Sequence, residues 1–574
     1  MTMLVRFVGD APESEPVETG RGSRWWPGEV RVVDDAIGLA LVAAHEGWEA
    51  CRESDTSGAL TADEAKALRA LVSADGIRLL GGPTARPRLL IIGNSIAGQS
   101  CRIGASYTSS VAVAAGSGIK PGSNQITLTT GGVAALSLSP NDYIVVQTAN
   151  QQPWPVQVTG ISTETLTLAK RLPWTVRTVS GLNAGVSKVT APVLFGGVWR
   201  QQFGIHNLAN ALAGGLFEVV PGYGHGSATA DEIIAVLPQH LQFYRPAVVM
   251  LSLFENSIGS GTASELIAMA DRAAGLCLAA GARPIVLHTL PTTAVGSSRA
   301  DEYDDLRTAI LNIAARVPGA IGIDPGSIYL DTSDGTNPRR PLSGWTDGVV
   351  HPLESKRATI ALNGGLVAAL QSCAQGQTVN IPALLQGANP TMAGTGGTGS
   401  TLGGTPVVAA STTIAVTGPG LTGTASKNAD DSQRVGAEDA GSVTAGTEAL
   451  TVAQTYSLPV SWGFRTRVKL MAEVTVHSQT NLASIRVSTS FGTQDVDMRT
   501  SASSEPFDTT LVGRKVVLES MPVPVLDPSV TSATITLAFR TLTATGFAVD
   551  ATVHSLGFAV ASCGEVDDGA IALL

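Results

Sequence analysis

The chain has 574 residues, of which 44% are hydrophobic and 15% charged, and its formal net charge is −10. This length exceeds a single compact core and predicts about three or four domains, while the apolar content excludes a wholly disordered protein. The acidic balance and the lack of a Lys/Arg-rich stripe argue against nucleic-acid binding through phosphate contacts.

Cysteine usage and the start of the chain give further limits. The five cysteines are scattered, and no Cys/His spacing is typical of zinc, so we expect neither structural zinc nor a disulfide framework. The first residues lack the basic and apolar segments of a secretory signal, and no apolar run reaches the roughly 18–20 residues that cross a bilayer. We therefore expect a protein made in a cytoplasm, without membrane insertion.

Residues 1–55 predict a small α+β module. MLVRFVG has the pattern of a strand, GRGSRWWPGEVRVVDD that of a hairpin-like segment, and DDAIGLALVAAHEGWEA that of a helix. This succession resembles small accessory modules of bacteriophage virion proteins, which implies attachment to a virion. Residues 56–85 predict a connecting helix, because Thr61 and Glu64 have the spacing of a capping box.

An α/β domain interrupted by a β insertion is predicted next. Its first strand, RLLIIG, lies within residues 86–103, and residues 104–204 alternate apolar and β-branched residues with turn residues, which predicts an all-β insertion. Residues 205–375 then alternate apolar strands with helices, a pattern typical of a parallel sheet covered on both faces. The expected helices contain ATADEIIAVLPQHL, SELIAMADRAAGLCLAAG and EYDDLRTAILNIAARV, and the expected strands PAVVMLSLF, RPIVLHTLP and AIGID.

The last third of the chain contains two regions of different composition. Residues 376–430 are rich in Gly, Thr and Ser, which is compatible with a flexible linker or a tightly turning β segment, and we expect the linker. Residues 431–574 contain several alternating segments separated by polar turns, which predicts an antiparallel β-sandwich with the character of a carbohydrate-binding module.

Four segments of the α/β domain carry the residue types that acyl transfer by a serine needs: a hydroxyl, a base with an orienting group, and donors for the oxyanion. In chain order they are Gly93-Asn94-Ser95, PGYGHGSATADEI, LSLFENSIGSG and GWTDGVVHPLESKRATIALNGGL. Because doubly wound sheets bind ligands at the carboxyl ends of their strands, we expect the four segments to meet at one edge of the sheet.

Together the four segments resemble the four blocks of the SGNH (GDSL-type) serine hydrolase family, over residues 86–103 and 205–375. The resemblance implies a flavodoxin-like three-layer α/β/α fold and a carboxylic ester hydrolase that needs no metal or other cofactor. It also implies that Ser95 is the nucleophile, His351 the general base and Asp347 the group that orients the imidazole.

The same resemblance implies the oxyanion hole. Its donors would be the backbone N–H groups of Ser95 and Gly226 and the side-chain amide of Asn256, with Gly224 as the alternative glycine. Asn94, His225 and Glu255, which flank these positions, are candidate substrate-binding residues.

Three features depart from the family pattern. Gly-Asn-Ser replaces Gly-Asp-Ser, and Ser257 stands where an acid often follows the asparagine. Asp347 precedes His351 by four residues, where the family usually has three. Asp334 or a backbone carbonyl is therefore an alternative group to orient the imidazole of His351.

These features predict a serine esterase, most concretely one that removes O-acetyl groups from a bacterial surface polysaccharide. The virion-like module places it on a phage tail, made in the host cytoplasm and acting at the bacterial surface beside other tail proteins. Tail appendages are usually homo-oligomers, so a trimer is plausible. The alternatives are a receptor-binding or structural virion protein whose SGNH fold binds glycan without cleaving it, and a bacterial esterase or lipase with accessory β modules.

Overall fold

The computed structural model describes five strands within the first 51 residues and most of the chain from residue 86 onward. The described ranges are 2–7, 13–14, 24–25, 30–34, 48–51, 86–101, 103–104, 111–114, 124–147, 154–169, 185–189, 197–224, 226–259, 261–374, 376–439, 443–459, 467–491, 494–501, 505–524 and 530–561. The connecting helix predicted for 56–85 lies outside them. In this part of the chain no helix has the length and apolar character needed to cross a membrane.

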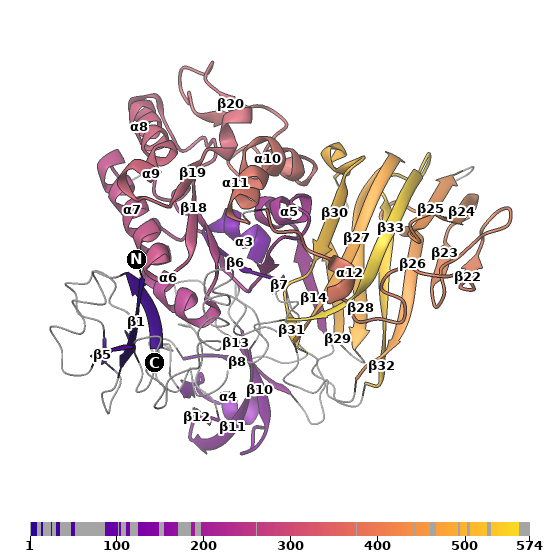
Figure 1. Ribbon diagram of the computed structural model, residues 1–574, viewed down its shortest axis with the longest axis horizontal. Helices are drawn as coiled ribbons and strands as arrows, with labels where there is room; N and C mark the ends of the chain where they lie inside the picture. Colours follow the sequence, from indigo (N-terminus) through magenta and orange to yellow (C-terminus); the bar gives the residue numbers. More distant parts are fainter. Residues whose placement is uncertain are drawn as a thin grey trace.

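A parallel sheet forms the centre of the α/β domain (Figure 1). All its strand pairs are parallel, in the order β15-β6-β17-β18-β19, and β16 also pairs with β6. Numbered along the chain, with β15 and β16 counted as one position, this is the 2-1-3-4-5 order of flavodoxin-like folds. The strands are β6 (Arg88–Gly93), β15 (Glu218–Val219), β16 (Tyr223–Gly224), β17 (Val248–Ser252), β18 (Arg283–Leu287) and β19 (Ile321–Ile323).

Helices cover both faces of this sheet, as the alternating sequence pattern predicted. Successive side chains of a strand point to opposite faces. Accordingly, Leu89 and Ile91 of β6 join one hydrophobic cluster and Leu90 and Ile92 the other. The first cluster includes α3 (Ser95–Cys101), α5 (Ile205–Leu212), α10 (Arg357–Asn363) and α11 (Leu366–Cys373). The second includes α6 (Ala230–Tyr244), α7 (Ala263–Ala279), α8 (Ala300–Leu311) and α9 (Ile313–Arg316), so the last predicted helix is divided at Asn312.

The insertion forms an antiparallel sheet of its own, ordered β8-β13-β10-β11-β12-β9 (Figure 1). One turn of helix, α4 (Gly132–Ala135), lies among its strands, so the insertion is not all-β. The strands are β8 (Val111–Ala112), β9 (Gln125–Thr127), β10 (Tyr143–Gln147), β11 (Trp154–Ser162), β12 (Thr165–Leu168) and β13 (Gly185–Val189).

The C-terminal region is a β-sandwich of two sheets. Phe558 of β33 packs against Tyr456 of β26 and Phe491 of β28, with ring centroids 6.2 and 5.8 Å apart, which places the sheets face to face. The first sheet contains β22 (Thr398–Ser400), β23 (Thr413–Val416), β26 (Glu448–Ser457), β28 (Leu482–Phe491), β29 (Gln494–Arg499) and β32 (Ser532–Thr541). The second contains β24 (Leu421–Lys427), β25 (Gln433–Asp439), β27 (Arg467–Thr480), β30 (Lys515–Glu519), β31 (Val523–Pro524) and β33 (Ala548–Val560).

Two expectations for this region were wrong. Residues 376–430 are not a linker: they contribute α12 (Ile381–Leu384) and strands β22 to β24, and Ile414 and Leu421 are buried in the core. The sandwich is also not purely antiparallel, because β22 pairs parallel with β23 and β14 pairs parallel with β29. Small polar residues thus supply edge strands here, because their backbone groups find partners in neighbouring strands.

The first sheet of the sandwich also contains two short strands that lie earlier in the chain, before residue 205. β7 (Ile103–Gly104) pairs with β14 (Gly197–Gln202), and β14 pairs with β29. Both ends of the segment 104–204 therefore belong to the sandwich rather than to the insertion. Pairing across such distances in sequence leaves no local pattern, which is why the sequence did not predict it.

The N-terminal strands form a small sheet with β1 (Thr2–Phe7) between β4 (Val30–Asp34) and β5 (Trp48–Cys51), all antiparallel. A hairpin-like pair, β2 (Glu13–Ser14) and β3 (Arg24–Trp25), accompanies it. The helix predicted to extend to residue 50 cannot do so, since β5 occupies its last residues; the segment 35–47 lies outside the described residues.

Candidate active site

Ser95 stands at the start of α3, directly after the strand β6. Asn94 caps this helix: its Oδ1 accepts a hydrogen bond from the N–H of Ile96 at 3.0 Å. Gly93 lets the end of β6 lie close against β17, because a Cβ there would meet the Ser252 carbonyl oxygen at 2.2 Å. Ser95 therefore lies at the carboxyl edge of the sheet, beside the junction of β6 and β17 where the strand order reverses, which is where folds of this type bind ligands.

The histidine that the sequence analysis paired with Ser95 contacts it directly. His351 Nε2 lies 2.9 Å from Ser95 Oγ, and His351 Nδ1 lies 2.8 Å from Asp347 Oδ2. An imidazole that carries its proton on Nδ1 donates to the Asp347 carboxylate and accepts from the Ser95 hydroxyl. The three side chains thus form the continuous chain of contacts that activates a serine.

A tight turn absorbs the extra residue between Asp347 and His351. The Asp347 N–H donates to the His351 carbonyl at 2.9 Å, and Asp347 Oδ1 accepts from the N–H groups of Val349, Val350 and His351. Gly348 has a φ of +92°, a left-handed conformation that favours glycine. The turn curls the chain back on itself, so a separation of four residues still brings the carboxylate to the imidazole.

The electrostatics of Asp347 favour its ionised form. Partial burial acts to raise the pKa of this carboxyl, but the hydrogen bonds from His351, Val349 and Val350 and the charge of His351 outweigh it and lower the pKa overall. Asp334, the alternative orienting group, is engaged elsewhere: it accepts from the N–H groups of Thr336 and Asn337 and pairs with Arg340 at 2.6 Å. Asp347 is therefore the carboxylate at His351.

The predicted oxyanion donors belong to loops that leave the same edge of the sheet. Gly93, at the end of β6, is in register with Gly224 of β16 on one side and with Ser252 of β17 on the other. Ser95, Gly226 and Asn256 follow these positions within a few residues. Asn256 Nδ2 donates to the Ala228 carbonyl at 3.0 Å, which ties its loop to the loop of Gly226.

The two candidate glycines occupy different environments. Gly224 is buried, and a Cβ there would meet the Gly98 nitrogen at 2.2 Å, so this glycine lets β16 pack directly on α3. Gly226 is exposed, and a Cβ there would meet nothing within 4 Å. Gly224 thus has a packing role, while the exposed Gly226 has room beside it and remains the predicted oxyanion glycine.

Two of the three residues proposed to bind substrate do not reach the surface. Asn94 is 0% exposed and Glu255 is 7% exposed, so their contacts are with the chain itself. Asn94 Nδ2 donates to Glu255 Oε2. The third, His225, lies outside the described residues.

The structure also reveals supporting residues that the sequence analysis missed. His206 is buried behind α3, with Nδ1 3.0 Å from Ser100 Oγ and Nε2 2.9 Å from Ser252 Oγ. Asp508, from the sandwich, accepts from the N–H groups of Ala358 and Thr359 in the first turn of α10. A cap residue normally precedes its helix in the chain, so no local signal identifies Asp508.

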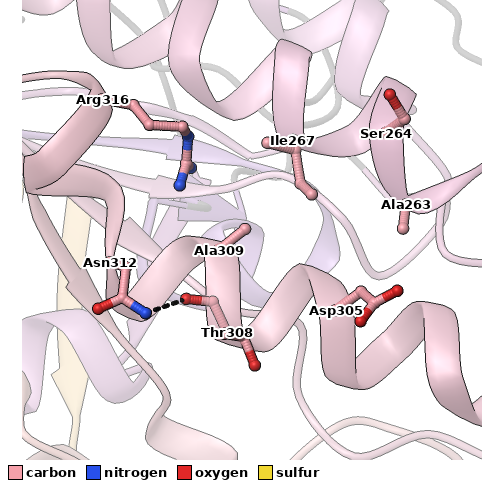
Figure 2. Close-up of a pocket in the computed structure, with 8 residues that line it drawn as sticks. All are labelled: Ala263, Ser264, Ile267, Asp305, Thr308, Ala309, Asn312 and Arg316. Carbon is pink, nitrogen blue, oxygen red and sulfur yellow. Dashed lines mark hydrogen bonds between the residues drawn. The ribbon is translucent and has the colours of Figure 1, made fainter.

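A groove lies away from this site. Figure 2 shows a groove between α7 and α8, lined by Ala263, Ser264, Ile267, Asp305, Thr308, Ala309, Asn312 and Arg316. None of these residues belongs to the cluster around Ser95. Among the described residues, no group of three or more His, Cys, Asp or Glu side chains is placed to hold a metal ion.

No family model and no curated protein matches the sequence. Solved structures resemble part of it. A family 3 carbohydrate esterase from Talaromyces cellulolyticus is 16% identical with a TM-score of 0.25, and the match covers 31% of this chain and 94% of that one. The Clostridium thermocellum family 3 carbohydrate esterase is 16% identical (TM-score 0.23; 29% and 89% covered). A GDSL-like lipase from Bacteroides thetaiotaomicron is 13% identical (TM-score 0.22; 26% and 75% covered).

Proposed function

We propose that this protein is a serine hydrolase of carboxylic esters with the catalytic arrangement of the SGNH class. The observation that carries the proposal is the chain of contacts from Ser95 Oγ to His351 at 2.9 Å and from His351 to Asp347 at 2.8 Å. These residues come from opposite ends of the α/β domain, and the chain turns sharply to present each of them. A purely structural serine has no need of such an arrangement.

The chemistry follows from the protonation states. His351 takes the proton of Ser95 through Nε2 as Oγ attacks the acyl carbon, and Asp347 stabilises the resulting imidazolium. The protonated imidazole then returns its proton to the departing alcohol. Water, deprotonated in its turn by His351, attacks the acyl-enzyme; the bond from the acyl carbon to Ser95 Oγ then breaks, His351 returns the proton to Oγ, and the acid is released.

The backbone N–H groups of Ser95 and Gly226 and the side chain of Asn256 would hold the oxyanion. An amide nitrogen carries two N–H bonds, so the bond from Asn256 to the Ala228 carbonyl occupies one of them and orients the other. This third donor is fixed before the substrate arrives, which is the condition under which such donors lower the barrier most.

The proposed substrate is an O-acetylated bacterial surface polysaccharide. The side chains of His351 and Asp347 are 37% and 45% exposed, so the site is open to an ester carried on a large polymer. Two β-rich regions, the insertion and the sandwich, offer surface for binding glycan. We further propose that the protein is a phage tail component that forms a homo-oligomer, such as a trimer, and acts at the host surface beside other tail proteins.

The enzyme assignment is tested by measuring acetate release from a chromogenic acetate ester and from O-acetylated polysaccharide, with wild-type protein and the Ser95→Ala variant. Wild type should release acetate, and Ser95→Ala should lower kcat/KM by about 10³-fold or more. Ser264→Ala, an exposed serine in the groove of Figure 2, is the matched control and should behave as wild type. Equal activity of wild type and Ser95→Ala, with no labelling by a serine-directed phosphonate, would favour the glycan-binding virion protein instead.

A further inference from the structure

Asn94 is held in place by hydrogen bonds of its side chain and of its backbone. Its Oδ1 accepts from the N–H of Ile96 at 3.0 Å, and its backbone N–H donates to the Ser252 carbonyl at 3.1 Å. Because Oδ1 serves the helix, the amide nitrogen must point the other way, where it donates to Glu255. Asn94 and Glu255 are buried, so this bond is shielded from water.

Glu255 connects two loops at the carboxyl edge of the sheet. Its carboxylate accepts a hydrogen bond from Asn94, which follows β6, while Glu255 itself follows β17. Burial raises the pKa of Glu255, although the hydrogen bond from Asn94, the nearby backbone N–H groups of Glu255 and Leu290 and the charge of His288 oppose the rise.

We propose that Glu255 is a positioning residue: through Asn94 it sets the start of α3, and so directs Ser95 Oγ toward His351. The inference rests on the proposed esterase function and adds a residue that does not touch the substrate. Ser95 directly follows Asn94, so any rotation of the cap moves the nucleophile. A displacement of about 1 Å in a reacting group can cost roughly 100-fold in rate.

The direction of this hydrogen bond, from Asn94 to Glu255, explains why an asparagine stands here in place of the aspartate usual in this motif. An aspartate at position 94 would bring a second buried carboxylate against Glu255, and the two could not both ionise. The donor and acceptor can, however, be exchanged. An aspartate in place of Asn94 would still accept from Ile96, and a glutamine in place of Glu255 would donate to it while keeping one acceptor oxygen.

The test compares Asn94→Asp, Glu255→Gln and the double variant on a chromogenic acetate ester. Each single variant should lower kcat by about 10- to 100-fold with little change in KM, because the nucleophile is misplaced and the binding surface is not. The double variant should recover about tenfold or more relative to the worse single variant. Glu473→Gln, a glutamate equally buried at 7% exposure but located in the sandwich, should leave kcat unchanged.

Independent losses that simply add in the double variant, or unchanged kcat in Glu255→Gln, would overturn the proposal while leaving the esterase assignment intact. If wild type shows no hydrolysis that depends on Ser95, the proposed function fails. The free energy of unfolding of the same variants then decides whether the pair is coupled. If the double variant recovers stability relative to the single variants, the pair is coupled as proposed. If the two losses of stability add, the proposal is rejected.

Discussion

Asp347 Oδ2 lies 2.8 Å from His351 Nδ1 although the two residues are four positions apart in the chain. The turn that joins them is closed by the Asp347 N–H on the His351 carbonyl and by three N–H groups on Asp347 Oδ1. The carboxylate therefore has two roles, since one oxygen builds the turn and the other orients the imidazole.

Replacing Asp347 by Asn should lower kcat by about 10³- to 10⁴-fold, because a neutral amide neither fixes the Nδ1–H tautomer nor stabilises the imidazolium. Asp334→Asn is the control, because Asp334 pairs with Arg340 and not with His351. Steady-state kinetics on an acetate ester decides between them. A larger loss in Asp334→Asn than in Asp347→Asn would reverse the assignment.

Gly348→Ala tests the conformation of the turn apart from its packing. A Cβ at Gly348 would meet nothing within 4 Å, so any effect comes from the φ of +92°. We expect the free energy of unfolding to fall by about 1 kcal/mol and kcat to fall as well. Gly335→Ala, also in open space but without a positive φ, should change neither quantity.

Gly224, the last residue of β16, and Gly226, which lies two residues further on, should respond differently to alanine. Gly224→Ala forces a Cβ against the Gly98 backbone, so it should lower both the melting temperature and kcat. Gly226→Ala has room for its Cβ and keeps its N–H, so it should retain most of its activity and stability. Thermal unfolding and kcat measured on both variants check this. Equal losses in the two would show that Gly226 is also packed.

Acid should destabilise the fold through buried histidines. Burial lowers the pKa of His206 to about 3, and burial likewise lowers that of His240 to about 4, against a bond to the Val236 carbonyl that raises it. In the unfolded chain both titrate near 6.5, so between that pH and the folded values only the unfolded state binds the protons. Each histidine then costs about 1.4 kcal/mol of stability per pH unit as the pH falls from 6.5 toward 4.

Urea unfolding of wild type and His206→Gln at several pH values between 7 and 4.5 measures this dependence. The variant should have a slope smaller by about 1.4 kcal/mol per pH unit, whatever its stability at pH 7. Parallel pH profiles for the two proteins would show that His206 does not contribute.

The sandwich should support the active site through Asp508. Asp508→Ala leaves the Ala358 and Thr359 N–H groups without their carboxylate and should cost about 0.5–2 kcal/mol of stability. Because α10 begins six residues after His351, behind one short 3-10 turn, kcat should fall as well, with KM little changed. Kinetics and unfolding on the same preparations test both effects, and an unchanged kcat would limit Asp508 to a structural role.

The sequence by itself determined the features that local periodicity carries. Apolar strands alternate with amphipathic helices from residue 205 onward, and each predicted helix and strand of that region is present. The resemblance of the four segments to the blocks of SGNH hydrolases also pointed to Ser95, His351, Asp347, Gly226 and Asn256 as one group. The positions of helices and strands can be predicted in this way because side chains repeat at a fixed period along each element.

Only the tertiary structure decided which distant segments pair. β14 joins β29 across about half the chain, residues 398–427 supply strands rather than a linker, and Asp508 caps a helix of another domain. The same holds for Glu255, whose sequence neighbourhood suggested a substrate contact and whose partner is the buried amide of Asn94. Hydrogen bonds between remote segments depend on how the chain folds back, and the backbone groups that form them are identical in every residue except proline.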